Sequence, residues 1–429
     1  MTTPTRRTRV FGIFPTFRGW WIVAVGFLGL YLHGSATSYL FALLIVPMET
    51  DLGWSRTTLV GALTVATFVS GGAGLVLGPI FDRQGVRFGM TLSALLGGTF
   101  MLLLAAMSAP WQLYLLFGVG LGVTRVGLEN VGPRTAIANW FVRRRAAAFA
   151  WFSGGRALFG ATLLVPIAVM VDNTSWRSGW IAIGALEIAV LAPLAWLVVR
   201  RRPEDVGQLP DGDEPGVGSA LGTAGDDDGL SGGEIQWTRG EAARTRSFWY
   251  MTAAFVLVGF PATGIIANIM PYMQGSGLSL VAASWAFSMY GYGAILGRPL
   301  WGYVAARFGV RLGLTAFGIS YGITIGAFVI ADSTPTLFAA AFPLGTVIGG
   351  IQQLQSQAWP DYFGRRHAGA IAGLTTLLIM PAMATGPLIA AFAFGVAGSY
   401  TPVFSAYGVA CFAAGVFFFL AKPPVRRPR

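Results

Sequence analysis

Long apolar runs separated by short connections make up most of the chain. A helix needs about 20 mostly apolar residues to cross the hydrocarbon core of a bilayer. Twelve runs reach this length: 20–46, 56–80, 88–108, 111–138, 146–171, 176–199, 248–273, 280–303, 311–331, 336–359, 368–395 and 401–421. The pattern therefore predicts an all-α integral membrane protein with 12 transmembrane helices.

One polar segment, residues 200–247, interrupts this pattern between the sixth and seventh runs. It opens with three arginines and is rich in Gly, Pro and Asp, so it has too little apolar surface to fold alone. We interpret it as a flexible linker. The predicted organisation is an N-terminal tail, a six-helix bundle, the linker, a second six-helix bundle and a C-terminal tail, at residues 1–19, 20–199, 200–247, 248–421 and 422–429.

The composition supports the membrane assignment and removes several classes of protein. Hydrophobic residues make up 54% of the chain and charged residues only 11%, against about 25% charged in a typical soluble domain. One cysteine and two histidines cannot form an intramolecular disulfide or a Cys/His zinc site. We therefore predict no metal and no cofactor.

The net charge of +11 is explained by topology. Of the 29 basic residues, 23 fall on one side of the membrane if the N-terminus is cytoplasmic, two fall on the other side, and four lie within the predicted spans. The positive-inside rule then places both termini in the cytoplasm. The basic charge does not indicate a nucleic-acid partner, and the lipid bilayer is the expected environment.

The two halves of the chain are similar in sequence at a spacing of about 223 residues. Residues 78–87 and 302–311 are identical at five of ten positions, and a second similarity joins residues 140–145 to residues 362–367. Two parallel copies of a six-helix unit are typical of transporters that rock around a site at the membrane midplane.

At this point the sequence resembles the major facilitator superfamily, whose loop between spans 2 and 3 carries a signature like the one here at Gly78, Asp82, Arg83, Gly85 and Arg87. Within that superfamily it looks most like the monocarboxylate transporters and the bacterial oxalate:formate antiporter group. The motifs that carry this second resemblance are Arg18-Gly19-Trp20-Trp21, Gly53-Trp54-Ser55-Arg56, Trp140-Phe141-x-Arg143-Arg144-Arg145 and Gly297-Arg298-Pro299-x-x-Gly302.

The resemblance implies two pseudo-symmetric six-helix bundles, a multi-pass protein of a bacterial inner membrane, and a monomer that moves small carboxylates. It also implies that Asp82, Arg83 and Arg87 form a gating loop, in which the carboxylate braces neighbouring helix ends. The second copy of this loop has Ala306 in place of the aspartate.

Arginine within a span is costly to insert, by at least about 2.5–3.5 kcal/mol, and usually faces a cavity or a partner. Arg298 has no acidic residue in its own span. A guanidinium binds a carboxylate through two parallel hydrogen bonds, and the resemblance places the substrate-binding arginine of monocarboxylate transporters here. The competing interpretation is a packing residue, or one whose head group reaches the interface.

Two more arginines accompany a glutamate in the first half. Arg125 and Glu129 are spaced i,i+4 and share a helix face, so they form either a self-neutralising pair or a proton-coupled switch that frees Arg125 for an anion. Arg156, where the family usually has Ser or Thr, offers a second anion contact or a cross-helix partner for Glu129. Arg134 is expected near the interface.

Five further polar side chains within the spans are candidates for the site. Glu187 is a second proton-coupling candidate beside Glu129, and its other expected role is that of a structural partner. His33 is expected to be a hydrogen-bonded packing residue, and a proton relay is the alternative. We add Tyr39, Asn268 and Gln355 to the predicted substrate site with Arg298, Arg125 and Arg156. The resemblance to animal monocarboxylate transporters places Tyr39 near the position of a lysine in their first span. Amide side chains in a span need water or a partner.

The predicted function is secondary active transport of small organic anions by alternating access, with a proton as candidate coupling ion. Ala294 replaces an aspartate of the animal transporters and span 11 lacks the lysine of the oxalate:formate antiporter, so neither coupling scheme carries over directly. The alternative is a multidrug or metabolite exporter with Glu129 as the cavity carboxylate. An enzyme or sensor is disfavoured, since no nucleophile–base pair or phosphate loop is present.

Overall fold

The computed structural model describes residues 17–212, 237–364 and 367–424, without the side chains of residues 82–84. Within these residues, 11 helices are long and apolar enough to cross a membrane, and the number of spans is 12 when a bent pair is counted as one. The predicted all-α fold with 12 spans is confirmed.

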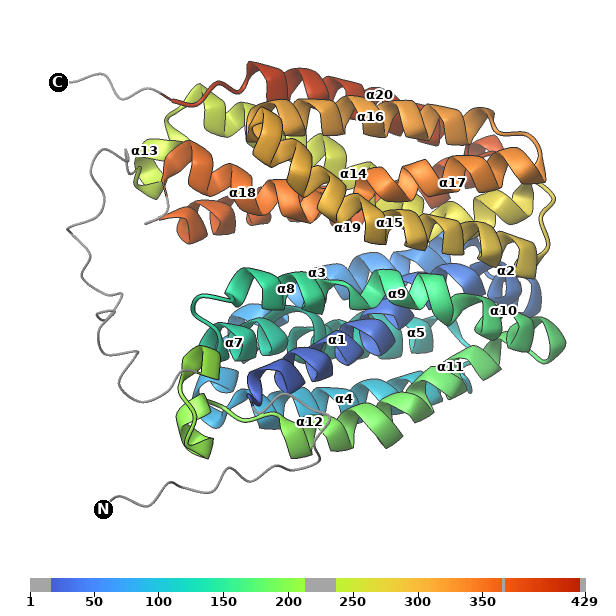
Figure 1. The fold of residues 1–429 in the computed structure, drawn as a ribbon. Helices are drawn as coiled ribbons and strands as arrows, with labels where there is room; N and C mark the ends of the chain where they lie inside the picture. Colours follow the sequence, from blue (N-terminus) through green and yellow to red (C-terminus); the bar gives the residue numbers. More distant parts are fainter. Residues whose placement is uncertain (1–16, 213–236, 365–366, 425–429) are drawn as a thin grey trace, which may run out of the picture.

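The first half of the chain forms a bundle in which several spans are broken into consecutive helices (Figure 1). Its six spans are α1, η1 and α2 (Gly19–Ser35, Ala36–Leu40, Phe41–Leu52); α3 (Arg56–Gln84); α4 (Val86–Leu104); α5, η2, α6, η3 and α7 (Pro110–Leu113, Tyr114–Leu121, Gly122–Arg125, Val126–Asn130, Val131–Trp140); α8, α9 and α10 (Arg145–Ser153, Gly155–Thr162, Leu164–Asn173); and α11, η4 and α12 (Trp176–Leu186, Glu187–Leu191, Ala192–Val198). Segments η1 to η4 are π-helical turns.

The second half forms a bundle of more regular helices. Its spans are α14 (Arg246–Gly275), α15 (Leu280–Phe308), α16 (Val310–Ile330), α17 with α18 (Thr334–Ile348, Ile351–Phe363), α19 (Ala368–Ala397) and α20 (Thr401–Leu420). Short helices also occur inside the predicted linker, namely η5 (Pro203–Val206), η6 (Pro210–Gly212) and α13 (Arg239–Ala243). Residues 213–236 of that linker lie outside the described residues, as do most of the two predicted tails.

Local sequence explains where the long helices begin and where two spans break. The hydroxyls of Ser55, Thr245 and Ser279 each accept a main-chain N–H of the first turn, at 3.2 Å, at the starts of α3, α14 and α15, as good N-caps do. Between α9 and α10 the chain bends by 42°. Pro166 lies just beyond this bend, and its ring clashes with the carbonyl four residues earlier.

The repeat detected in the sequence appears in the structure as a matching pair of contacts. Gly85 and Gly309 have φ of 93° and 82° and each separates two helices, a conformation that favours glycine. Arg87 donates to the Trp196 carbonyl at 2.6 Å and lies over its ring. Arg311 does the same with Phe419, at 2.9 Å. In both bundles an arginine thus ties the third helix to the sixth.

The two bundles lie side by side (Figure 1). We call the end that carries Gly85, Gly309 and the predicted linker the linker end, and the opposite end, with Gly53 and Gly398, the far end. Hydrogen bonds that join the bundles between the middle and the far end include those from Thr64 Oγ1 to the Ala384 carbonyl at 2.8 Å, from Ser288 Oγ to the Gly160 carbonyl at 2.7 Å, and from the Tyr292 hydroxyl to the Ala161 carbonyl at 2.8 Å.

Toward the linker end, by contrast, the helices pack mainly within their own bundles. Helix α8 packs against α1, α7 and α9, and α18 packs against α15, α16 and α19. The two bundles therefore contact each other mainly on the far-end side of the midplane, and on the linker-end side each bundle packs mainly with itself.

Candidate functional site

Five ionisable side chains gather near the middle of the N-terminal bundle, where each touches at least one other. They come from α1, α6, η3, α9 and η4 and are His33, Arg125, Glu129, Arg156 and Glu187. We call this group the charged cluster. The C-terminal bundle contributes Arg298 from α15, which reaches the N-terminal bundle beside it.

Glu129 is the centre of the cluster and is only 5% exposed. One of its oxygens lies 2.6 Å from Arg156 Nη2, and the other lies 3.1 Å from Arg125 Nε and accepts the Thr37 hydroxyl at 3.0 Å. The pairing of Glu129 with Arg125 along span 4 and its pairing with Arg156 on span 5, both considered from the sequence, are therefore present together. One buried carboxylate is shared by two arginines.

The guanidinium of Arg125 has hydrogen-bond donors that this arrangement leaves without an acceptor. Although its Nε is close to Glu129, the N–H directions do not meet the carboxylate, and Nε and Nη1 are both buried without a hydrogen bond in the described part of the chain. The side chain is 17% exposed. Buried donors of a charged group rarely remain unpaired, because their desolvation costs more than about 1–3 kcal/mol.

Irregular helix turns position these groups. Thr37 lies in the π-helical turn η1 and Glu129 in η3, and such turns occur often at functional sites. Gly34, on α1, accepts Arg156 Nε at 3.1 Å through its carbonyl. A side chain at Gly34 would begin 3.1 Å from Arg156 Nη2, so the glycine leaves room for the ion pair.

Arg298 forms a bridge between the bundles. Its Nη2 donates to the main-chain carbonyl of Ser153, at the end of α8, at 2.7 Å. The Arg298 side chain is half-buried, and its present partner is a neutral carbonyl.

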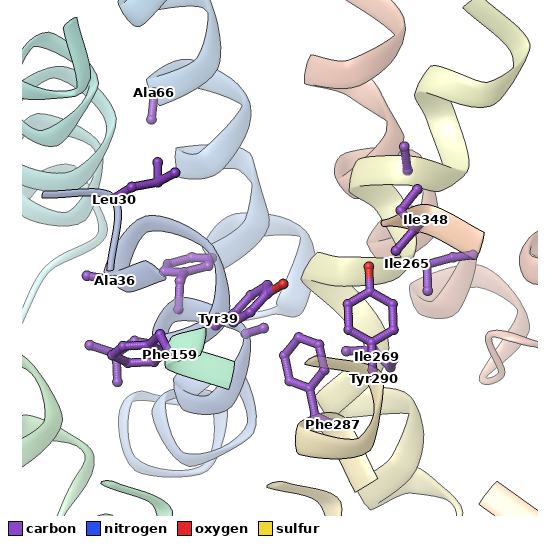
Figure 2. Close-up of a cluster of buried hydrophobic side chains, with 14 of the residues drawn as sticks. Leu30, Ala36, Tyr39, Ala66, Phe159, Ile265, Ile269, Phe287, Tyr290 and Ile348 are labelled. Atoms are coloured by element: carbon purple, nitrogen blue, oxygen red, sulfur yellow. The ribbon is translucent and has the colours of Figure 1, made fainter. Parts of the chain in front are cut away.

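Tyr39 lies where the two bundles meet. Its ring centroid is 4.8 Å from that of Phe287 on α15, and it is 4% exposed. Figure 2 shows Tyr39 directed from the N-terminal bundle toward Phe287 and Tyr290 of the opposite bundle. Gly160 makes this approach possible, because a side chain there would begin 2.8 Å from the tyrosine ring.

The remaining pair of the cluster lies deeper in the N-terminal bundle. His33 Nδ1 is 3.0 Å and 3.2 Å from the two oxygens of Glu187, and both side chains are fully buried. His33 Nε2 lies 3.3 Å from the Thr124 hydroxyl. In the described residues, no group of three or more His, Cys, Asp or Glu side chains could hold a metal ion.

Comparison with known proteins identifies the fold and the general activity. The family model of the Major Facilitator Superfamily matches residues 26–283 and 260–429. The chain belongs to the Major Facilitator Superfamily. Members of this superfamily are transporters, and the chain is accordingly a multi-pass membrane transporter.

Several relatives within the superfamily have names that refer to carboxylates. The chain is 24% identical to the oxalate:formate antiporter of Oxalobacter formigenes over 78% of this chain and 75% of that protein. It is 26% identical to monocarboxylate transporter 3 of Rattus norvegicus over 85% of this chain and 71% of that protein. The resemblance to this group within the superfamily is therefore confirmed, at low identity.

A solved structure of a bacterial homologue of the human lysosomal transporter Spinster, in an inward-facing and unoccupied conformation, has a TM-score of 0.70. It covers 94% of this chain and 97% of that one at 16% identity. At this identity the likeness establishes the shared fold and nothing about the substrate.

The other predicted site residues of this superfamily member lie apart from the cluster. Asn268 is fully buried in α14, where its amide donates to the Gly264 and Pro387 carbonyls and accepts the Tyr400 hydroxyl. Gln355 is half-buried on α18, with no hydrogen bond to its amide among the described residues. Their roles in binding stay predictions.

Arg134 is exposed on α7, toward the linker end. The side chains of Asp82 and Arg83 lie outside the described part of the chain, so of the predicted gating residues only Arg87 can be placed. A small cavity of about 220 Å³ is lined at the same end by residues that include Asn139, Arg201 and Arg202. None of its lining residues belongs to the charged cluster.

Contacts that were not expected from the sequence include those of Thr37 with Glu129, of Thr124 with His33, and of the Ser153 carbonyl with Arg298. Thr37 lies four residues after His33 in the first span, so the two polar side chains share a helix face. This spacing could have indicated that Thr37 faces the other polar residues of the bundle. A main-chain carbonyl carries no sequence signal, since every residue has one.

Proposed function

We propose that this transporter moves small organic anions, with monocarboxylates as the substrate class, by alternating access. The observation that carries the proposal is Arg125, whose Nε and Nη1 are buried without a hydrogen bond in the described residues. A carboxylate bound beside Arg125 would supply the missing acceptor. It would do so in a setting of low dielectric constant, where a charge-assisted hydrogen bond is strong.

Arg298 would give the second contact, from the opposite bundle. A carboxylate accepts hydrogen bonds more strongly than the neutral Ser153 carbonyl that Arg298 now contacts. An anion held by Arg298 on one side and by Arg125 or Arg156 on the other would join the two bundles at the midplane. Tyr39, whose ring lies 4.8 Å from that of Phe287 of the opposite bundle, would line this site.

The charge balance supports an anion. The predicted spans contain four arginines and two glutamates. A single carboxylate, Glu129, pairs with both Arg125 and Arg156, which leaves these three side chains with a net charge of +1. The names of the antiporter and the monocarboxylate transporter to which the chain is similar refer to anions as well. A lipophilic cation would have to displace arginines from Glu129, which weakens the alternative of a multidrug exporter.

The orientation follows from the basic residues. We place the linker end, with both termini, in the cytoplasm of a bacterium, because 23 of the 29 basic residues then face inward. In the structure the two bundles contact each other from Arg298 to the far end, which is then the outer side. We therefore interpret the structure as an inward-facing state of a monomer. Arg87 would act with Asp82 and Arg83 at the cytoplasmic gate, and Glu129 and Glu187 are the candidate proton carriers.

Uptake by purified protein in liposomes tests this function. Radiolabelled lactate, pyruvate, formate and oxalate serve as probes, and Arg298→Ala is expected to lower uptake of the transported acid at least about tenfold, since a buried charged hydrogen bond contributes about 1.5–3 kcal/mol. Arg298→Lys should retain part of the activity, because it keeps the charge and loses the paired donors.

Arg307→Ala is the matched control. Arg307 lies on the same helix, but its guanidinium stacks over Phe308 at the linker end, so uptake should stay near the wild-type rate. Undiminished uptake by Arg298→Ala would show that Arg298 does not bind the substrate. Export of cationic dyes that depends on Glu129 and survives Arg298→Ala would favour the exporter.

A further inference from the structure

The pair formed by His33 and Glu187 is the second group of ionisable side chains in the core of the N-terminal bundle. Both side chains are 0% exposed. The imidazole Nδ1 faces both carboxylate oxygens, at 3.0 Å and 3.2 Å. A hydrogen bond within this pair is made whether the proton resides on nitrogen or on oxygen, so the geometry suits a shared proton.

The Thr124 hydroxyl fixes the other side of the imidazole. It lies 3.3 Å from Nε2, and the Leu121 and Gly120 carbonyls lie within donating distance of the hydroxyl, at 3.1 Å and 3.3 Å. A hydroxyl has one proton to donate, so with that proton on Leu121 the Thr124 oxygen accepts from Nε2–H. Because Nε2 is then protonated, the short contact between Nδ1 and Glu187 holds one further proton, as imidazolium with carboxylate or as imidazole with carboxylic acid.

The packing around the pair leaves no room for another side chain. On α4, a side chain at Gly97 would begin 2.5 Å from a Glu187 oxygen and 3.0 Å from the imidazole. The charged groups that act on His33 from the other elements are Glu129 on η3 and Arg125 on α6. Arg156 and Arg134 act on Glu129 in turn.

We propose that His33 and Glu187 together form a proton-binding site, separate from the anion site, and that its proton sets the net charge of the cluster. With one proton the pair is neutral, and without it the pair carries −1. Arg125, Arg156 and Glu129 together carry +1. The whole cluster is therefore +1 with the proton and 0 without it.

This charge change couples the proton to the anion, on the basis of the function proposed above. Protonation from water adds one positive charge near Arg125, which follows Thr124 directly in sequence, and so it favours binding of a carboxylate beside Arg125. Loss of the proton returns the cluster to neutrality and favours release. Glu129 can remain ionised throughout, held by its two arginines, and the two sites communicate through the field in a medium of low dielectric constant.

The chain is well suited to a direct test, because His33 and His367 are its only histidines. In a His367→Gln protein with isotope-labelled histidine, NMR reports His33 alone. The imidazole signals are expected to change between about pH 5 and about pH 9, and Glu187→Gln is expected to displace that change, because the variant removes the charge partner. Signals of His33 that stay constant over this range would overturn the proposal, and this measurement needs no variant of the pair to fold.

The coupling is measured separately, as stabilisation of the purified protein by lactate, pyruvate or formate at several pH values. Apparent affinity for an acid that binds should rise as the pH falls, by up to about tenfold per pH unit for one linked proton, and Glu187→Gln should flatten this dependence. Equal pH dependence in Glu187→Gln and in the unmodified protein would overturn the coupling.

The outcomes separate the two proposals. If none of these acids binds while His33 still titrates with Glu187, the anion assignment fails and the proton site stands. If an acid binds in an Arg298-dependent manner while the His33 signals stay constant, the anion site stands and the proton site fails.

Discussion

The two bundles share a backbone plan but differ in what fills them. The N-terminal bundle contains the buried ionisable residues His33, Glu129 and Glu187, and all four of the π-helical turns in the described residues. In the C-terminal bundle, the described buried polar residues are uncharged: Thr252, Asn268, Ser284, Ser288 and Thr375. Its helices are continuous α-helix, apart from the break between α17 and α18.

Close helix packing takes the place of charge in the C-terminal bundle. Along the contact between α15 and α17, a side chain at Gly293, Gly297, Gly345 or Gly349 would overlap the main chain of the facing helix. Small residues that let backbones approach are a common way to hold transmembrane helices together. The matching contacts of Arg87 and Arg311 show that the frame of the repeat is the same in both halves. The comparison indicates that one half carries the ionic chemistry while the other supplies Arg298 and rigid support.

The largest expected effect comes from removing the charge at the centre of the N-terminal bundle. Glu129→Gln leaves Arg125 and Arg156 without their carboxylate, and breaking a buried ion pair from one side costs about 3–5 kcal/mol. The fall in the melting temperature of the purified Glu129→Gln variant measures this loss of stability. Glu49→Gln, at a side chain that is 30% exposed, should shift the melting temperature much less. Equal shifts in the two variants would mean that the cluster adds no special stability.

In the C-terminal bundle the corresponding weak point is a glycine. Gly297→Ala places a methyl group against the Thr346 carbonyl and must push α15 away from α17, at about 1–3 kcal/mol by the usual cost of overpacking. Gly302→Ala, on the same helix, is the control, because the nearest atom is 3.9 Å away. Thermal unfolding should separate the two variants, and identical melting curves would show that α17 can move aside freely.

A smaller effect is expected where the bundles meet at the far end. Arg56, on α3, pairs with Glu49 in its own bundle at 2.7 Å and lies over the Phe394 ring of the other bundle at 4.0 Å. A cation–π contact of this kind contributes about 0.5–2 kcal/mol, so Arg56→Gln should open the far end several-fold more often.

The labelling rate of a cysteine placed at Thr64, in a Cys411→Ala background, measures this opening. Thr64 lies at the same inter-bundle contact. Arg177→Gln is the control, since Arg177 pairs with Asp51 inside one bundle. Labelling that rises equally in both variants would show that the Arg56 contact is not what keeps the far end closed.

The smallest effect concerns the start of the linker. Asp211 adopts φ of 60° and accepts the main-chain N–H groups of Val142, Arg143 and Arg144 at 3.0, 2.7 and 3.2 Å. Partial burial opposes ionisation of Asp211, but these hydrogen bonds outweigh it and lower the pKa of the carboxyl. Since the pKa is lower in the folded protein, the stabilisation is present above the unfolded value of about 3.9 and is lost as the pH falls through the folded pKa.

Hydrogen exchange of the amides of residues 142–144 measures this contact. Asp211→Asn should speed exchange about fivefold near neutral pH, which corresponds to about 1 kcal/mol, and the difference from the unmodified protein should vanish in strong acid. Asp205→Asn, which removes the charge of the side chain that accepts the Arg202 N–H in the same segment, should leave these amides unchanged. A difference that persists in strong acid would assign the effect to something other than the charge.

Much of the frame of this transporter followed from the sequence. Span lengths are dictated by bilayer thickness, so apolar runs predicted the 12 spans, and the break in span 5 follows from Pro166. The repeat predicted two similar halves, and Arg87 and Arg311 make equivalent contacts. The i,i+4 spacing of Arg125 and Glu129 predicted their proximity, because helix geometry alone fixes it.

The contacts between helices required the tertiary structure. The sequence left open whether Glu129 pairs with Arg125 or with Arg156, and the fold shows that it meets both. It could not show that Arg298 reaches the Ser153 carbonyl, or that His33 faces Glu187, 154 residues away. Hydropathy and helical periodicity determine which residues enter the membrane and which share a helix face. Which faces of different helices meet depends on how small residues and bends let those helices pack, and that was decided only in three dimensions.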